Sequence, residues 1–311
     1  MTSPLHICLL LGLAAALVTA LVLPIWRNWS QRVGLVDDPG HRKIHDQPVS
    51  LAGGLAVLTG LLLSLFTAWL AFKLSAPPAI PLAAILSGAV AMTLLGLLDD
   101  KFELRPLIKF TGQLLIATAA TAAGVRLSLF VAHPVLSYAA TILWILTVIN
   151  AFNFMDNMNG LCAGLSVIAA TFAGVLAVLH GQHQIAALAF AVGGAALGFL
   201  PGNYPRATVF LGDAGSHLLG FLLAVLVIQP GLWSSAHSST TPVLGPILLL
   251  SVPLLDLVWV TLIRTRKGRP FYIGDNNHLS HRLVRRGFSR ATAVAFIWVL
   301  AVLGGSLAFL L

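Results

Sequence analysis

Long apolar runs separated by short polar joints dominate the amino-acid sequence. A helix needs about 20 apolar residues to cross a bilayer, and only helices or closed barrels satisfy their backbone hydrogen bonds there. The runs are rich in Leu and Ala and lack the period-2 alternation of barrel strands. We therefore predict an all-α integral membrane protein, a single membrane domain over residues 1–311, with about ten transmembrane helices. The predicted spans are residues 5–26, 51–72, 79–98, 107–123, 134–152, 160–179, 184–200, 213–228, 243–263 and 291–311.

The composition excludes a water-soluble globular domain. Of the 311 residues, 58% are hydrophobic and only 9% are charged, against about 25% charged residues in soluble domains. The net charge of +8 does not indicate nucleic-acid binding, because the basic residues lie in short loops between apolar runs, an arrangement typical of membrane orientation. The first run has no basic n-region and is long for a signal peptide, so we predict that it is a retained helix.

The charged residues fall on one face of the predicted helix bundle. The loops after alternate spans and the flanking helix ends hold 16 of the 18 Lys and Arg residues, and only Lys73 and Arg126 fall on the opposite face. The positive-inside rule then places the basic face in the cytoplasm and the N- and C-termini outside. All ten acidic residues map to the same face, although acids contribute little to topology. Because unpaired carboxylates beside a membrane are costly and often functional, we expect an active site on the cytoplasmic face.

The third span closes on an acidic cluster that runs from Asp99 and Asp100 to Glu103. If the helix continues, Asp99 and Glu103 lie one turn apart. The adjacent Asp99 and Asp100 then point about 100° apart and can serve two partners. Clusters of this kind suit Mg²⁺, which takes carboxylates together with substrate phosphates. The pattern alone is also typical of a solvated helix end.

An asparagine-rich segment, NAFNFMDNMNG at residues 150–160, follows the fifth span. Asn150, Asn153, Asp156 and Asn159 recur every third residue and would form one polar stripe if helical. Their oxygens are suitable ligands for a metal and suitable hydrogen-bond partners for a nucleoside. An ordinary turn between spans rarely needs so many polar side chains interleaved with Phe and Met. We therefore predict a site here, with Asp156 and Asn159 as substrate-binding residues.

Three further segments of this face carry candidate chemistry. Asp213 opens the eighth span, where the helix N-terminus can support phosphate, although a simple helix cap is the alternative. His278 and His281 would share a face if helical, and they suit acid–base work or phosphate binding better than zinc. The basic loop before the second span could bind a lipid phosphate or could merely obey charge topology. Its candidate substrate-binding residues are Arg42, Lys43 and His45.

Five ordered sequence elements together resemble the polyprenyl-phosphate N-acetylhexosamine-1-phosphate transferase family. This family includes the phospho-MurNAc-pentapeptide translocase and GlcNAc-1-phosphate transferases, and the resemblance runs from Gly34 to Phe288. It implies that a polyprenyl phosphate attacks the β-phosphorus of a UDP-amino sugar and releases UMP, in the bacterial cytoplasmic membrane. The elements are HRKIH at 41–45, DDxxE at 99–103, NAFNFMD at 150–156, FLGDAGS at 210–216 and the histidine pair at 278–281.

The resemblance also implies a Mg²⁺ cofactor and roles for particular residues. Asn153 and Asp213 match the family's magnesium ligands. Asp99 and Asp100 match an aspartate pair assigned to lipid-phosphate activation and to the metal environment. Lys109 matches a lysine near the diphosphate, and Phe210 is a candidate to stack on uracil. The positions that match the surroundings of the uridine are Gly160, Leu161, Asn203 and Phe210.

Two positions depart from the family pattern. Asn159 stands where many bacterial relatives have a second Asp, but the eukaryotic branch also has Asn there, so activity is not excluded. Ser280 replaces one histidine of the usual H-x-H-H element, so no role of that imidazole carries over. The sequence leaves two routes open: a one-step attack, or a two-step route with Asp99 or Asp100 as nucleophile. We favour one step because the lipid phosphate is already a competent nucleophile.

The expected partners are a UDP-N-acetylhexosamine, with UDP-GlcNAc as first choice, undecaprenyl or another polyprenyl phosphate, the lipid bilayer and, as an open option, a second copy of the chain. Three rival functions would each produce a different sequence pattern. An intramembrane prenyltransferase would carry two DxxxD-type clusters, whereas Asp156 and Asp213 stand alone. A transporter would place ionisable groups near the bilayer midplane, where Asp256 is the one candidate. A non-catalytic lipid-binding relative would have lost Asp99, Asp100 or Asp213, and all three are present.

Overall fold

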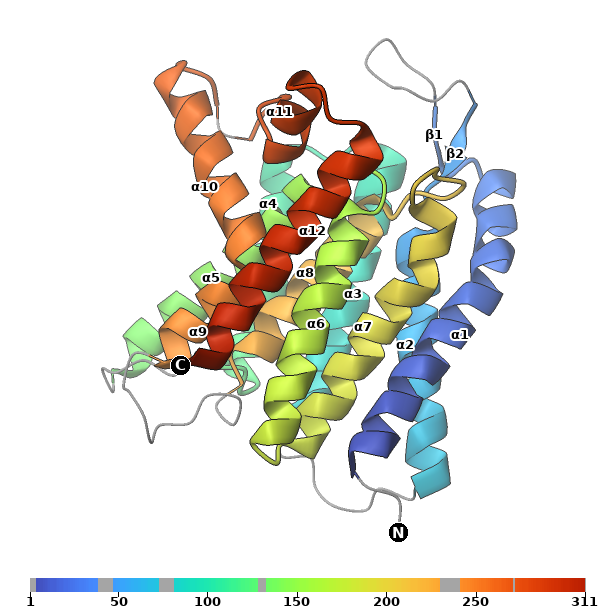
Figure 1. Ribbon diagram of the computed structural model, residues 1–311, viewed down its shortest axis with the longest axis vertical. Helices are drawn as coiled ribbons and strands as arrows, with labels where there is room; N and C mark the ends of the chain where they lie inside the picture. Colours follow the sequence, from blue (N-terminus) through green and yellow to red (C-terminus); the bar gives the residue numbers. More distant parts are fainter. Residues whose placement is uncertain are drawn as a thin grey trace.

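The computed structural model describes residues 4–38, 47–72, 81–127, 133–229, 241–270 and 272–310. Within these ranges the chain is almost entirely helical, and its long helices run side by side (Figure 1). Two short strands, β1 (Val36–Asp37) and β2 (Val49–Ser50), pair in antiparallel fashion. The helices are α1 (Pro4–Arg32), α2 (Gly53–Phe72), α3 (Leu82–Phe102), α4 (Pro106–Ala122), α5 (Pro134–Met155), α6 (Leu161–Leu179), α7 (His183–Asn203), α8 (Gly212–Val227), α9 (Thr241–Leu249), α10 (Ser251–Arg266), α11 (Leu279–Arg285), α12 (Arg290–Leu307) and the short 3₁₀ helix η2 (Ala308–Leu310).

The predicted all-α membrane fold is confirmed. Seven described helices are long and apolar enough to cross a bilayer, and the bent pair α9 and α10 makes an eighth. The remaining two predicted spans fall on α4, with 17 residues, and α8, with 16 residues. At 1.5 Å per residue α8 is about 24 Å long, shorter than a hydrocarbon layer of about 30 Å. Because α8 lies inside the bundle, neighbouring helices rather than lipid surround it.

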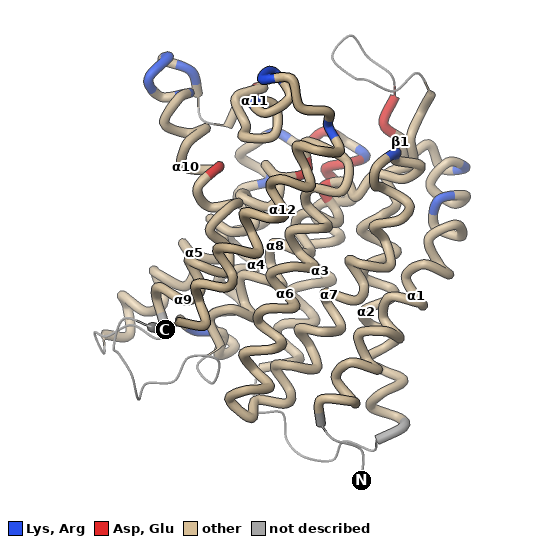
Figure 2. The backbone as a smooth tube through the Cα atoms, in the orientation of Figure 1, with Lys and Arg blue, Asp and Glu red and all other residues tan. Residues whose placement is uncertain are grey.

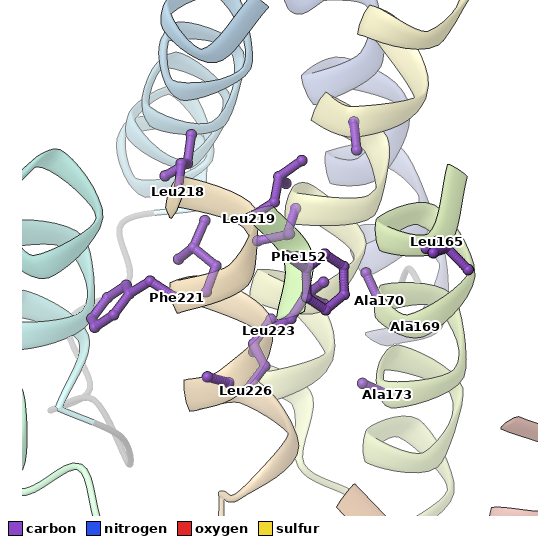
Figure 3. Close-up of a cluster of buried hydrophobic side chains, with 14 of the residues drawn as sticks. Phe152, Leu165, Ala169, Ala170, Ala173, Leu218, Leu219, Phe221, Leu223 and Leu226 are labelled. Carbon is purple, nitrogen blue, oxygen red and sulfur yellow. The ribbon is translucent and has the colours of Figure 1, made fainter. Parts of the chain in front are cut away.

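The centre of the bundle is α8. Every residue of this helix except Asp213 is buried. A helix that is apolar all round belongs in the interior of a bundle, and α8 packs against α2, α3, α5 and α6. Figure 3 shows part of this core, in which side chains of α8 lie opposite Phe152 of α5 and a row of small side chains on α6. The α8 side chains labelled there are Leu218, Leu219, Phe221, Leu223 and Leu226.

The ninth span differs from the prediction because it is broken. Helices α9 and α10 meet at an angle of 84°, where a continuous helix over residues 243–263 was predicted. Pro253 supplies the physical reason, since it has no N–H to donate to the carbonyl of Leu249 and its ring disfavours a continuous helix. As a result α10 leans away from the other helices (Figure 1).

The charged residues gather at one end of the bundle, here termed the charged end. Figure 2 shows the acidic residues and most of the basic residues there, and Figure 1 shows that α1 begins and α12 ends towards the opposite end. The paired strands β1 and β2 lie at the charged end, and an isolated bridge joins Ser50 to Val209 beside them. The predicted lipid-phosphate residues Arg42, Lys43 and His45 lie outside the described residues.

Helices α1 and α7 approach closely because small residues face each other. A Cβ atom built on Gly194 would lie 2.0 Å from the carbonyl oxygen of Gly12, and one on Gly198 would lie 2.2 Å from that of Ala16. Small residues let helix backbones approach in membranes, where van der Waals packing drives association. By contrast, a Cβ atom on the neighbouring Gly193 would meet nothing closer than 3.2 Å.

This difference predicts unequal effects of the same substitution on one helix. Gly194→Ala should lower the midpoint of thermal unfolding in detergent by several degrees, because overpacking costs about 1–3 kcal/mol. Gly193→Ala is the matched control and should leave the midpoint within about a degree, since the added methyl group needs little adjustment. Equal midpoints for the two variants would contradict the close packing of α1 on α7.

Candidate active site

A cavity of about 1560 Å³ lies at the charged end, between the ends of α3, α4, α5, α8 and α10. Acidic and amide side chains line one part of it, and apolar side chains of α4, α5 and α10 line another. The predicted site residues among its walls are Asp99, Asp100, Lys109, Asn153, Asp156, Asn159, Asn203, Phe210, Asp213 and His281. The structure therefore brings together residues from four of the five predicted sequence elements, with Lys109 and Asn203, although they are far apart in the chain.

Lys109 connects two of the predicted carboxylates. Its Nζ atom lies 2.7 Å from Asp99 Oδ2 and 2.7 Å from Asp213 Oδ2. The other oxygen of Asp99 accepts a hydrogen bond of 2.9 Å from the backbone N–H of Leu104, just beyond the end of α3. One ammonium group thus offsets the repulsion between two carboxylates that approach from different helices, and charge-assisted hydrogen bonds of this kind are the strong ones.

Asp100 serves a different partner from Asp99, as the 100° offset predicts. Its two oxygens accept hydrogen bonds from the backbone N–H groups of Asp213, at 2.7 Å, and Ala214, at 3.0 Å. These are free amides of the first turn of α8, where a negative charge also gains from the helix dipole. Gly212 begins this turn with φ of +72°, and a Cβ atom there would lie 2.6 Å from Asp100 Oδ2. Only glycine therefore allows Asp100 to cap α8.

Asp156 completes the acidic wall as the residue that ends α5. Burial raises the pKa of its carboxyl to about 8, and the negative charges of Asp213 and Asp100 act in the same direction, while a hydrogen bond from the backbone N–H of Gly212 opposes them. Asp156 therefore holds a proton at neutral pH in the protein alone. The predicted polar stripe is helical only for Asn150 and Asn153, because α5 ends at Met155.

Asn153 lies against Asp213, its predicted partner in metal binding. Its Nδ2 atom donates to Asp213 Oδ1 and, at 3.1 Å, to Ser216 Oγ. A half-turn of the amide would present Oδ1 in place of Nδ2, beside the carboxylate. Among the described residues no three His, Cys, Asp or Glu side chains form a closed metal cage. An open pair of one carboxylate and one amide nevertheless fits Mg²⁺, which usually binds through one or two carboxylates together with substrate phosphates.

The predicted uridine-binding residues divide into two groups. Asn203 and Phe210 line the cavity, and Asn203 Oδ1 accepts a hydrogen bond from the backbone N–H of Gly160 while its Nδ2 donates to the carbonyl of Val209 at 2.9 Å. Gly160 adopts a φ of +78°. It lies, with the buried Leu161, behind the cavity wall rather than among the residues that line it. Asn203 therefore joins two loops of the site, which sequence spacing did not indicate.

The two histidines also differ in position. His278 is buried, and its Nδ1 atom lies 2.6 Å from Asp256 Oδ2, while Asp256 Oδ1 accepts a hydrogen bond of 2.7 Å from the backbone N–H of Leu279. His281 lines the cavity. Burial lowers the pKa of His281, and the nearby charge of Arg285 acts in the same direction. The Asp256 carboxylate thus orients His278 and the start of α11.

Arg264 is a component of the site that the sequence analysis missed, because it lies in a basic run that was explained by topology. It is only 1% exposed and contacts Asp275 Oδ1 at 3.3 Å, and its guanidinium lies 4.8 Å from the centre of the Phe154 ring. Ser280, which stands where the family has a histidine, donates a hydrogen bond of 2.6 Å to Asn157 Oδ1. These contacts fasten the loop before α11 to the asparagine-rich segment.

The Arg264–Asp275 pair predicts a pH-dependent stability. Burial alone would raise the pKa of Asp275, but hydrogen bonds from Arg264 and Asn277 outweigh it and hold the pKa at about 2. A lowered carboxyl pKa contributes stability above the unfolded value near 4, and this contribution is lost as the pH falls towards 2. Asp275→Asn should therefore lower the thermal midpoint at pH 7, and the difference from wild type should shrink below about pH 4.

Asp38→Asn, at the exposed residue that directly follows β1, is the control for this measurement and should change neither the midpoint nor its pH dependence. A deficit of the Asp275→Asn variant that stays constant from pH 7 to pH 3 would contradict the charged pair.

Known proteins resemble this chain in the region that forms the cavity. The sequence model described as Glycosyl transferase family 4 matches residues 82–231, which include the acidic wall, Lys109 and the N-terminus of α8. A probable undecaprenyl-phosphate N-acetylglucosaminyl 1-phosphate transferase of Bacillus subtilis is 32% identical over 92% of this chain and 80% of the relative.

Two other relatives are similar over nearly the whole chain. A decaprenyl-phosphate N-acetylglucosaminephosphotransferase of Mycobacterium tuberculosis is 34% identical over 95% of this chain and 81% of its own length. An undecaprenyl-phosphate alpha-N-acetylglucosaminyl 1-phosphate transferase of Escherichia coli K12 is 30% identical over 94% and 81%. Together with the cavity that unites the predicted site residues, these matches show that the chain belongs to the family of polyprenyl-phosphate N-acetylglucosamine-1-phosphate transferases.

Proposed function

We propose that the protein transfers N-acetylglucosamine 1-phosphate from UDP-GlcNAc to undecaprenyl or another polyprenyl phosphate, as the initiating step of a cell-envelope glycan. An oxygen of the lipid phosphate attacks the β-phosphorus of the donor. The bond from that phosphorus to the bridging oxygen breaks, and UMP leaves with the oxygen. The observation that carries the proposal is the Asp99–Lys109–Asp213 cluster, set on the wall of a cavity in a chain of this family.

The cavity has room for both substrates. Pockets for one small ligand measure about 300–1,000 Å³, and this cavity holds about 1560 Å³. Its polar part, with Asn203, Phe210 and His281, suits a nucleotide sugar. Its apolar part includes Phe110 of α4 and Leu143 of α5. Both side chains are exposed at the outer surface of the bundle, so this apolar part reaches the surface and suits the start of a polyprenyl tail.

The cluster can stabilise a phosphoryl-transfer transition state. Negative charge on the transferred phosphoryl group is stabilised mainly by positioned cations and hydrogen-bond donors. When the donor binds, Lys109 would turn from the carboxylates to the diphosphate, because the diphosphate carries more closely spaced negative charge than they do. Both oxygens of Asp100 already accept hydrogen bonds from α8. This favours Asp99 as the carboxylate that positions the lipid phosphate or accepts its proton, in a one-step transfer.

A magnesium ion is part of the proposal. Asp213 and the carbonyl oxygen of Asn153 would hold it, and it would offset charge on the diphosphate as the reaction proceeds. Asp156, protonated in the protein alone, lies within the same wall and would lose its proton more readily beside a cation.

The charged end is proposed to face the cytoplasm. Most of the basic residues lie there (Figure 2), as the positive-inside rule requires, and both chain ends would then lie outside. The rival functions lack comparable support. Asp256, the one candidate for an ionisable group of a transporter, accepts a hydrogen bond from the backbone of Leu279 and contacts His278 Nδ1.

The reaction is tested by following UMP release. Purified protein with UDP-GlcNAc, undecaprenyl phosphate and Mg²⁺ should release UMP only when all three are present, and EDTA should stop the release until Mg²⁺ is restored. Asp99→Asn and Asp213→Asn should each lower kcat by at least about 100-fold, because they remove charges that position the phosphates. Asp38→Asn, a carboxylate of the same end outside the cavity, should retain wild-type activity. UMP release that needs no lipid, or survives Asp213→Asn, would refute the proposal.

The apolar part of the cavity predicts a dependence on lipid length. Leu143→Glu should raise KM for undecaprenyl phosphate about tenfold by removing apolar contact area and adding a charge. It should leave KM for a short prenyl phosphate of two isoprene units nearly unchanged. Leu136→Glu, on the same helix and similarly exposed but outside the cavity lining, is the control. An equal loss with both lipids would place the tail elsewhere.

A further inference from the structure

Three polar side chains lie beneath the acidic cluster, where the bundle is otherwise apolar. Gln113 of α4 and His217 of α8 are both 0% exposed. Asn150 of α5 donates to Gln113 Oε1 at 2.9 Å and to the carbonyl of Leu146 at 2.8 Å. Gln113 Nε2 lies 3.2 Å from His217 Nε2. Buried polar groups are costly unless they are hydrogen-bonded, so this connected trio calls for an explanation.

Each member of the trio lies one helical turn below a residue that lines the cavity. Gln113 follows Lys109 by four residues on α4, and His217 follows Asp213 by four residues on α8. On α5, Asn150 precedes Asn153 by three residues. Residues three or four apart lie on the same face of a helix, so the same three helices are joined twice.

We refer to Lys109, Asn153 and Asp213 as the upper tier and to Gln113, Asn150 and His217 as the lower tier. In the upper tier Asp213 of α8 is the central residue, bonded to Lys109 and Asn153. In the lower tier Gln113 of α4 is the central residue, bonded to Asn150 and His217. The upper tier faces the cavity, and His217 of the lower tier lies behind it.

The hydrogen bonds of the lower tier determine the protonation of His217. The Leu146 carbonyl can only accept, so the Asn150 amide must present its nitrogen, which then also donates to Gln113 Oε1. Gln113 must therefore turn its own amide nitrogen towards His217. An amide N–H₂ group can only donate, so His217 Nε2 is an acceptor without a proton. The imidazole is neutral and carries its proton on Nδ1, and within the described residues that Nδ1 has no hydrogen-bond partner.

We propose that Gln113, Asn150 and His217 are positioning residues, which keep α4, α5 and α8 in register while the upper tier exchanges its internal contacts for substrate. This inference rests on the proposed function. When Lys109 turns to the diphosphate and the oxygens of Asp213 turn to a cation, the direct links between the three helices open. Gln113 and Asn150 border the cavity one turn below the upper tier, and His217 lies behind them. The lower tier has no charge to exchange for a phosphate or a cation, so its links persist. A misplacement of about 1 Å at the reacting groups lowers the rate about 100-fold. The lower-tier links therefore support catalysis by keeping the helices that carry these groups in place.

A matched pair of variants at His217 tests the positioning role. The side-chain carbonyl of Gln can replace Nε2 as an acceptor for Gln113, whereas Met has similar size and no comparable acceptor. His217→Met should lower kcat about tenfold with KM for UDP-GlcNAc changed less than about threefold, because Gln113 loses its partner and the helices their link. His217→Gln should restore kcat to within about twofold of wild type. Equal kcat for Met and Gln, whether both high or both low, overturns the proposal.

The protonation state gives a readout that does not depend on activity. With ¹⁵N-labelled histidine, and the His217 signal assigned by its loss in His217→Gln, Nε2 of the wild type should show the chemical shift of a nitrogen without a proton. In Gln113→Glu the carboxylate faces Nε2, so the proton should move to that nitrogen. A protonated Nε2 in the wild type overturns the inference even if the enzyme is active. Absence of UMP release by the wild type, with the expected shift, instead refutes the proposed function and leaves the hydrogen-bond arrangement supported.

Discussion

Carboxylates gathered at the edge of a hydrocarbon layer repel one another unless positive charge or amide dipoles offset them, and the first turn of α8 provides that offset. Asp100 accepts from two of its free amides, the backbone of Gly212 faces Asp156, and Asp213 itself sits in the turn and is held by Lys109. Three acidic side chains therefore converge on one helix end, whose dipole and free amides stabilise the negative charges of Asp100 and Asp213 and whose first backbone N–H also faces the carboxyl group of Asp156.

This arrangement also explains why α8 is buried. A helix end can organise groups from α3, α4 and α5 only if it lies between those helices, and such a position leaves no face of α8 for lipid. Below Asp213 its sequence is accordingly apolar except for Ser216, which accepts from Asn153, and His217, which belongs to the lower tier. Packing of the core and the geometry of the site are thus two consequences of the same placement of one short helix.

Much of this could be predicted from the sequence. Hydrophobic run lengths located the helices, and the distribution of charge placed Asp99, Lys109, Asn153 and Asp213 at a common end. The pattern could not show which groups pair. The spacing of Asp99 and Asp100 predicted two partners, but the choice of Lys109 for one and the α8 backbone for the other depends on how separate helices rotate about their axes.

Other features were hidden for related reasons. Arg264 resembled an ordinary topological charge until its burial against Phe154 and Asp275 was seen. His217 stands alone in an apolar run, so no local pattern marked its partnership with Gln113, which is 104 residues away. Of the residues that match the surroundings of the uridine, Asn203 and Phe210 line the cavity, whereas Gly160 and Leu161 lie behind its wall. A sequence motif locates a site in the chain, but it does not distinguish the residues that line the cavity from those that lie behind them.

The break between α9 and α10 has a consequence for how the enzyme meets its lipid. Beyond the 84° bend, α10 contributes Leu257 and Thr261 to the cavity, whose apolar walls also include the exposed side chains of Leu107 and Leu143. The apolar part of the cavity therefore reaches the outer surface of the bundle. A lipid substrate can then diffuse to the cavity within the plane of the membrane, with its tail still in the hydrocarbon layer. The nucleotide arrives from solution. The two reactants then reach the acidic wall from different surroundings, one from lipid and one from water, and the lipid product can depart by the path along which its precursor came.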